Sequence, residues 1–521
     1  MISIKKISIV FVILLITNTL FAQYNSSKID SLVEYAMQQF NVVGVSVGIV
    51  KDGKIIHSKG YGLKTLGKKD KVDENTQFCI ASNSKAFTTT AITLLVEEGK
   101  LSWDDKVRDF IPEFKMYNAY VTENFTILDL LTHRSGLGLG AGDLMIFPDG
   151  SDFTITDIAQ SFQYQKPVSA FRTKYDYDNL LYLISGEVIA KVSGMTWEEF
   201  VANRILKPLE MDHTAAGISL VKEQKNLAIP HATVDNENHI IPQYHQMVNG
   251  AAAGIYSGVG DMEKWMLMHL NKGAYGESRE KHLFTAESQN TMWRIHTVKE
   301  VNRNPRYNSH FSGYGLGWEL TDFKGNMKVS HTGGMPGMLS KVIMIPDLNF
   351  GLVILTNTSD GGALLFESVS NEIVDSYLGL DDFMWIDKYA AYFKSMKAED
   401  HKLVNEVWET VEQADAKSIN KDNYIGIYKD PWFGEVEISI KDKQLWFRSL
   451  RSPKLNGSMK LYKANTFAIK WEYQDMNADA FAIFSLDEEG KAIAIKMKGI
   501  SPNIDFSFDF QDLNFVRIED K

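Results

Sequence analysis

Cysteine is almost absent from this chain of 521 residues, because Cys79 is the only one. A single thiol cannot form an intramolecular disulfide, so the protein folds without one. The 12 histidines show no spacing typical of a zinc site, and no His-Glu-x-x-His pair occurs. The sequence therefore predicts no metal and no other cofactor.

Basic residues are the minority among the charged ones, with 55 Lys and Arg against 66 Asp and Glu and a formal net charge of −11. A general nucleic-acid binder needs a concentrated basic face, so we expect no nucleic-acid partner. Hydrophobic residues make up 44% and charged residues 23%, which is an ordinary globular balance. A chain of this length is expected to form two or three domains.

The first 22 residues have the pattern of a secretory signal peptide. Lys5 and Lys6 precede a run, 7–16, that is apolar apart from Ser8, and Ala22 offers a small residue at the cleavage point. The run is shorter than a bilayer span, and no cysteine follows it directly that could carry a lipid. We expect export to a bacterial periplasm or beyond, with no stable membrane anchor after cleavage.

The chain then predicts a helix and a β-hairpin. Residues 27–41 are amphipathic, and two β-rich runs, 44–50 and 54–58, flank the turn pair Asp52-Gly53. The first run contains Gly-x-Ser-x-Gly around Ser46, a motif that is catalytic only at a strand-to-helix elbow. Because the strand continues through it, we interpret Ser46 as a strand residue.

A Ser-x-x-Lys pair stands where an apolar run meets a helix. Ser82 ends that run, and the helix expected after it extends to about residue 98 and stops at Gly99. Ser82 and Lys85 share one helix face, so a hydroxyl and an amine can act as a nucleophile and its base. This pair alone is common by chance, and its weight depends on the rest of the chain.

The remaining pattern predicts an α+β fold. From about residue 103 to 215 it is mostly helix and loop, a further helix is expected at 261–270, and strand patterns return at 314–318, 327–331, 340–345 and 350–356. Two early strands, a long helical body and later strands fit an antiparallel sheet flanked by helices plus a helical lobe. Helical patterns at 362–380 and 385–415 follow.

Short β-segments dominate the C-terminal part. They occur at regular spacing, at 424–428, 435–440, 444–449, 467–472, 481–485, 492–497 and 506–510. This spacing is typical of a small all-β sandwich or barrel. We therefore divide the chain into a signal peptide (1–22), a main domain (23–380), a helical linker (381–415) and a small β-barrel (416–521).

Three clusters occur in a fixed order: Ser82-x-x-Lys85, Tyr177-x-Asn179 and His331-Thr332-Gly333. With 60–62, 130–136, 207–211 and 314–318, they resemble the serine β-lactamase and penicillin-binding protein superfamily. The closest similarity is to the branch of class C β-lactamases, D-aminopeptidases, alkaline D-peptidases and esterases, and it covers about 25–380. The C-terminal part resembles the lipocalin-like domain fused to some of these peptidases.

The resemblance implies a role for each residue. Ser82 would be the nucleophile that forms an acyl-enzyme, with Lys85 and Tyr177 as its proton-transfer partners. Asn179 would orient Lys85 and the substrate amide. The strand with His331, Thr332 and Gly333 would lie along the substrate, and the backbone N–H groups of Ser82 and Gly334 would form the oxyanion hole.

Two residues depart from the β-lactamase pattern. His331 stands where β-lactamases of this branch carry Lys, so its pull on a substrate carboxylate is weaker. Asp178 stands where Ser is common, and we expect an acid at the edge of the site that favours substrates with a positive group.

The resemblance favours an exported serine hydrolase that cleaves amide bonds of short peptides, including peptides with D-residues. The alternatives are a carboxylesterase or a β-lactamase that uses the same residues, and a penicillin-binding sensor or scaffold that does not turn over. We expect loops such as 139–170 and 280–312 to form the pocket walls. Sequence leaves the oligomeric state open.

Overall fold

The structure is a computed structural model that describes residues 23–222, 224–234, 237–245, 248–415 and 419–518. The expected signal peptide and the expected domain boundary at residue 416 both lie outside these residues. Within the described chain, no helix is both long enough and apolar enough to cross a membrane.

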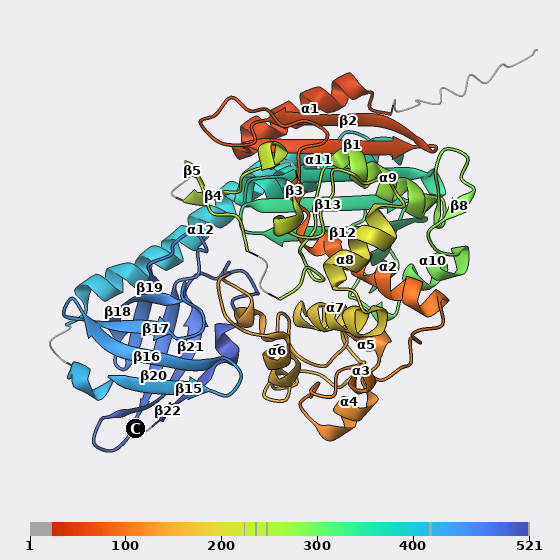
Figure 1. Ribbon diagram of the computed structural model, residues 1–521. Helices are drawn as coiled ribbons and strands as arrows, with labels where there is room; N and C mark the ends of the chain where they lie inside the picture. The colour runs from red at the N-terminus through yellow and green to blue at the C-terminus, as the bar shows by residue number, and fades with distance from the viewer. Residues whose placement is uncertain (1–22, 223, 235–236, 246–247, 416–418, 519–521) are drawn as a thin grey trace, which may run out of the picture.

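One antiparallel sheet of eight strands forms the centre of the main domain (Figure 1). In spatial order its strands are β2 (Lys54–Gly62), β1 (Gly44–Lys51), β14 (Phe350–Thr356), β13 (Met338–Ile345), β12 (Asn326–Met335), β11 (Glu319–Phe323), β10 (Ser312–Tyr314) and β9 (Thr297–Val298). The early strands thus pair with the late ones, in the register Val47↔Ile354. The predicted hairpin is confirmed, since Asp52 and Gly53 both have the positive φ values, 51° and 76°, that a type I′ turn requires.

The two faces of the sheet bury separate cores, because side chains alternate along each strand. Ile354 of β14 packs with α1 (Ser26–Phe40) and α11 (Asp360–Tyr377) on one face. Its neighbour Val353 packs on the other face, against α9 (Val259–Leu270). This arrangement confirms a sheet flanked by helices.

The helical lobe lies beyond α9, on the side of the sheet away from α1 (Figure 1). Its helices are α2 (Ser84–Glu97), α3 (Val107–Phe110), α4 (Ala119–Asn124), α5 (Ile127–Leu131), α6 (Ile155–Ser161), α7 (Leu180–Ser193), α8 (Trp197–Val201) and α10 (Ala286–Met292). Helix α2 is buried almost all round, which agrees with its continuous run of apolar and small residues and places it between sheet and lobe. It ends before Gly99, whose φ is 68°, as predicted.

A closed β-barrel forms the C-terminal part. Its strands are β15 (Gly426–Asp430), β16 (Gly434–Lys441), β17 (Gln444–Ser449), β18 (Asn456–Lys463), β19 (Thr466–Trp471), β20 (Ala480–Leu486), β21 (Ala492–Gly499) and β22 (Asn514–Ile518). Pairing of β15 with β22 closes it, at Tyr428↔Arg517. The long helix α12 (Trp385–Gln413) leads to it, and Val411 near its end packs against the barrel at Ala468.

Short strand pairs and turns complete the chain. The pairs are β3 (Phe78–Cys79) with β6 (Tyr256–Ser257), β4 (His231–Val234) with β5 (Glu237–Ile240), and β7 (Ala274–Tyr275) with β8 (Lys281–His282). Two predicted strands are wrong. Residues 315–318 form a turn closed by Gly315 N–H donating to Trp318 O at 2.8 Å, and 506–509 lie in a loop that runs toward the main domain.

Candidate active site

Ser82 is held at the junction between β3 and α2. It lies in a single 3₁₀ turn, Ala81–Asn83, directly before α2. The preceding residue, Ala81, has a left-handed φ of 47°, a conformation that costs energy and needs support from its surroundings. Hydrogen bonds of the neighbouring Ile80 provide this support. Its N–H donates to Ile255 O at 2.9 Å, and its carbonyl oxygen accepts the Ser340 hydroxyl at 2.6 Å.

Strand β12 approaches the backbone of Ser82 closely, and Gly333 makes this approach possible. A Cβ atom at position 333 would lie 2.2 Å from Ile80 O and 3.0 Å from Ser82 N. The next residue, Gly334, and the preceding one, Thr332, line the same cavity as Ser82. The structure thus brings the predicted oxyanion-hole residues to one place, while Gly333 serves close packing.

Lys85 Nζ contacts three oxygen atoms. It lies 3.0 Å from Ser82 Oγ, 2.7 Å from Asn179 Oδ1 and 3.0 Å from Ala252 O. The amide and carbonyl oxygens can only accept, so they take two N–H bonds, and a neutral amine then points its lone pair at the Ser82 hydroxyl. Burial lowers the pKa of Lys85 to about 7, against the opposing charges of Asp143 and Asp178. The amine can therefore act as a base near neutral pH.

Tyr177 reaches the same hydroxyl. Its phenol lies beside Ser82, and Lys85 Nζ lies 4.9 Å from its ring centroid. Complete burial raises the pKa of Tyr177 well above its usual value, so the phenol keeps its proton. His133 packs behind it at 4.3 Å between ring centroids, and its Nδ1 accepts the Asp178 N–H at 3.1 Å.

Asn179 links Lys85 to a buried carboxyl group that sequence reasoning missed. Its Nδ2 donates to Asp143 Oδ2 at 2.8 Å, which directs Oδ1 toward Lys85. Asp143 is fully buried, and burial raises its pKa well above the usual range. No motif marks Asp143, because it reaches Asn179 from a short turn in a loop.

His331 lies in the wall of the cavity as a neutral ring. Its Nε2 is 3.0 Å from the Tyr314 hydroxyl, and burial lowers its pKa to about 4. A neutral imidazole offers no charge to a substrate carboxylate. The sequence predicts a weak attraction between His331 and a substrate carboxylate, whereas the buried, neutral ring provides no cationic charge.

The expectation for Asp178 is wrong. Its side chain is fully buried, and its Oδ1 accepts the Leu181 N–H at 3.4 Å in the first turn of α7. It does not line the cavity. An Asp at this position can satisfy a free N–H group of the helix start, so the sequence could not distinguish this structural use from a substrate contact.

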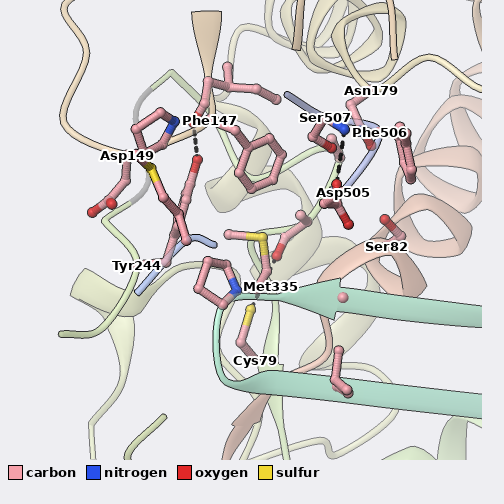
Figure 2. A pocket seen from close by; sticks show the side chains of 18 of the residues that line it. Cys79, Ser82, Phe147, Asp149, Asn179, Tyr244, Met335, Asp505, Phe506 and Ser507 are labelled. Atoms are coloured by element: carbon pink, nitrogen blue, oxygen red, sulfur yellow. Dashed lines mark hydrogen bonds between the residues drawn. The ribbon is translucent and has the colours of Figure 1, made fainter. Parts of the chain in front are cut away.

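Ser82 opens into a cavity of about 720 Å³ between the main domain and the barrel (Figure 2). The expected wall at 139–170 is confirmed by Leu139 and by 146–149, but none of residues 280–312, all described, lines it. Other walls come from the segment 175–183, from 232–233, 244 and 248–256, from β12 and the start of α11, and from two barrel loops, 473–477 and 503–508.

The barrel loop 503–508 is the part of the site that sequence reasoning missed most clearly. Phe506 meets the Tyr177 ring edge-on at 6.0 Å, and Asp505 accepts the Ser507 N–H at 2.9 Å. Figure 2 shows Asp505, Phe506 and Ser507 on the side of the cavity where Ser82 lies. The second loop is held by Asp475, 2.5 Å from His239 Nε2 of the main domain.

The lining carries acidic side chains without basic ones. Five carboxyl groups line it: Asp149, Glu319, Asp360, Asp475 and Asp505. Three of them pair with side chains outside the lining, but no Lys or Arg is among the described lining residues. Across the described chain, no group of three His, Cys, Asp or Glu side chains could hold a metal ion.

A model of the family "Beta-lactamase" matches residues 29–367, which include every one of these main-domain residues. The chain belongs to the beta-lactamase family. Members of this family are generally serine hydrolases. A second model, "Domain of unknown function (DUF3471)", matches residues 411–517, which include the barrel loops.

Curated relatives within this family cover most of the chain. "Protein flp" of Staphylococcus aureus (strain MW2) is 28% identical over 356 residues, 67% of each chain. "Unguisins hydrolase ungD" of Aspergillus violaceofuscus (strain CBS 115571) is 26% identical over 429 residues, 78% of this chain and 75% of the relative.

Solved structures share the fold. A penicillin-binding protein homologue from Pyrococcus abyssi, described as octameric, has a TM-score of 0.60 at 22% identity and covers 95% of this chain and 100% of its own. A class C beta-lactamase has a TM-score of 0.54 at 22% identity and covers 67% of this chain and 97% of its own. The first match extends over the barrel and the second does not.

Proposed function

We propose that this member of the beta-lactamase family hydrolyses amide bonds of short peptides through an acyl-enzyme on Ser82. The observation that carries the proposal is the surroundings of Lys85 Nζ, where two pure acceptors leave the lone pair for the Ser82 hydroxyl. Tyr177 supplies a second, protonated partner to the same oxygen.

The chemical steps follow from these positions. Ser82 Oγ attacks the carbonyl carbon while its proton passes to Lys85, and the backbone N–H groups of Ser82 and Gly334 bind the oxyanion. The C–N bond then breaks, and the leaving amine takes the Tyr177 proton, which Lys85 replaces. Water attacks the resulting ester, its proton returns through the same groups, and Ser82 is free again.

The charge of the cavity narrows the substrate class. A neutral His331 and a lining without Lys or Arg offer no partner to a carboxylate, so penicillins and other carboxylate-bearing acyl donors should react slowly. Carboxyl groups such as Asp505 favour peptides with a free amine, the role first expected of Asp178. Family resemblance adds D-residue peptides, such as cell-wall fragments, to the candidates.

A carboxylesterase is the second candidate, favoured by the apolar part of the lining. Phe147, Met335 and Phe506 offer a surface for a neutral acyl chain. Ester cleavage would use the same steps with an alcohol as the leaving group. A substrate series that changes the bond and the charge separately distinguishes the two activities.

Export remains part of the proposal, supported by the Lys5-Lys6 pair and the apolar run after it. Expression in a bacterium should yield a mature protein that begins at Gln23, as N-terminal sequencing can determine. Recovery of the full-length chain from the cytoplasm alone would contradict export.

Labelling tests the nucleophile directly. The purified protein is treated with a fluorophosphonate or with a penicillin, and the adduct is located by peptide mass spectrometry. We expect the fluorophosphonate on Ser82 and faster labelling by it than by penicillin. Labelling of another residue, or none by either reagent, would contradict the proposal and would favour a scaffold without turnover.

A substrate panel tests the charge argument. D- and L-alanine p-nitroanilides with a free amine are compared with their N-acetyl and N-succinyl forms, and with p-nitrophenyl acetate. The free-amine forms should have the highest kcat/KM among the anilides, and the N-succinyl forms, which add a carboxylate, the lowest. A preference for the succinyl forms would refute the charge argument.

A further inference from the structure

The barrel contacts the turn that carries Asp143 through Asp509, which does not line the cavity. Asp509 is fully buried, and its two carboxylate oxygens accept two backbone N–H groups of the main domain. Gly142 N–H donates to Oδ2 at 2.7 Å and Leu144 N–H donates to Oδ1 at 3.0 Å. These two donors flank Asp143 in the sequence, so one carboxylate of the barrel fixes the backbone on both sides of it.

The turn around Asp143 has the shape that this contact needs. Gly140 and Gly142 have φ values of 71° and 82°, in the left-handed region where glycine is favoured. A Cβ atom at Gly140 would lie 2.9 Å from the carbonyl oxygen of Phe506, so the barrel loop lies directly against this backbone. Gly140 N–H also donates to Tyr177 O at 2.8 Å, which ties the turn to the catalytic segment.

Asp143 decides the orientation of the Asn179 amide. An amide side chain can turn by 180° and exchange its oxygen and nitrogen, and only its partners fix it. Because Asp143 Oδ2 accepts from Nδ2, Oδ1 must face Lys85. With the opposite orientation, an NH₂ group would face the Lys85 amine, and the Ser82 hydroxyl would lose its base.

We propose that Asp509 is a positioning residue for the hydrolase: it holds the turn that presents Asp143, so that Asp143 fixes Asn179 with its oxygen toward Lys85. The proposal rests on the proposed function for its consequence in catalysis, but its effect on Lys85 is independent of turnover.

The direction of that effect follows from the groups around Lys85. Burial is the main cause of its lowered pKa. The titratable groups that face it are Asp143, Asp178, Tyr177, Tyr182, His133 and His331. Release of the Asp143 turn admits water to Lys85 and to the Asp143 carboxyl. Both changes favour the ammonium, so the pKa of Lys85 should rise.

The test compares Asp509→Ala with Glu489→Gln, which removes a charge from an exposed turn of the barrel. Lys85 is titrated in each full-length protein by competitive labelling with acetic anhydride and peptide mass spectrometry, a readout that needs no substrate. We expect Asp509→Ala to raise the Lys85 midpoint by at least one pH unit. Fluorophosphonate labelling of Ser82 at pH 7 should slow at least tenfold in Asp509→Ala, while Glu489→Gln leaves the midpoint and the labelling rate unchanged.

Further measurements distinguish unfolding of the variant from an error in the proposed hydrolase function. Circular dichroism shows whether Asp509→Ala is folded; if it is not, Asp509→Asn, which keeps only one acceptor oxygen, replaces it, with an expected Lys85 shift of the same sign. A folded variant with the wild-type Lys85 midpoint overturns the proposal. Failure of wild-type Ser82 to label refutes the hydrolase function alone, because the Lys85 titration still decides the role of Asp509.

Discussion

Replacement of Gly333 by alanine tests the close approach of β12 to the nucleophile. The new Cβ would lie 2.2 Å from Ile80 O and 2.4 Å from Ser340 Oγ, about 1 Å inside an ordinary carbon–oxygen contact. The strand must therefore retreat by a similar distance. This movement separates the Gly334 N–H from the Ser82 N–H, the two donors assigned to the oxyanion.

The magnitude follows from the loss of one such donor, which costs about 2.7–4 kcal/mol in the transition state. We expect Gly333→Ala to lower kcat by about 10²–10³-fold. Overpacking should also destabilise the fold by about 1–3 kcal/mol. The matched control is Gly334→Ala, whose added Cβ meets only Leu339 Cδ2, at 3.4 Å. It keeps its N–H group and should stay within about fivefold of the wild type.

The assay is single-turnover acylation of Ser82 by an activated ester, followed by mass spectrometry, with melting temperatures to confirm folding. Equal losses in both variants would show that crowding of the cavity, not movement of β12, is responsible. A folded Gly333→Ala variant that acylates within threefold of the wild type would refute the reasoning.

Further predictions concern titratable groups. The rate of Ser82 acylation should rise with pH to a plateau, with a midpoint near 7, because burial lowers the pKa of Lys85 to about 7. Lys85→Ala should slow acylation by about 10²–10⁴-fold. A rate that is constant from pH 5 to 9 would contradict the role of Lys85 as the base. Tyr177→Phe should slow release of the leaving group by about 10²-fold, as burst kinetics can measure, and leave the fluorophosphonate site unchanged. Burial raises the pKa of Cys79 to about 11, so Ellman's reagent should react only after unfolding, and rapid reaction of the native protein would show an exposed thiol. Burial raises the pKa of Glu263 to about 8 in the folded state, so its contribution to stability is present below about pH 4.5 and is lost as the pH rises through 8. Glu263→Gln should therefore raise the melting temperature more at pH 8.5 than at pH 5. An equal change in melting temperature at both pH values would refute this prediction.

The sequence correctly predicts those features that depend only on residues close to one another in the chain. Ser82 and Lys85 share a helix face, and the short, β-branched apolar runs in β1, β13 and β14 identify strands without knowledge of their partners. The family and its fold class follow from motif order. None of these inferences requires a contact between distant parts of the chain.

The failures have a physical cause in common. The run Phe506-Ser-Phe-Asp-Phe510 alternates between apolar and polar residues as a strand does. In the structure, however, Phe506 packs against Tyr177, and Asp509 accepts the N–H of Gly142, 367 residues away in the sequence. Conversely, β18 escapes prediction because few of its residues are strongly apolar, and pairing within the barrel rather than alternation orders it.

Because the cavity has walls from both domains, it is complete only after both domains have folded. During synthesis, Ser82 and its helix leave the ribosome more than 400 residues before Asp509, and the sheet can form as soon as β14 is made. The cavity, by contrast, lacks a wall until the barrel closes. Closure of the barrel thus completes the cavity, and a single cut in the exposed helix α12 would separate Ser82 from the barrel loops without changing either.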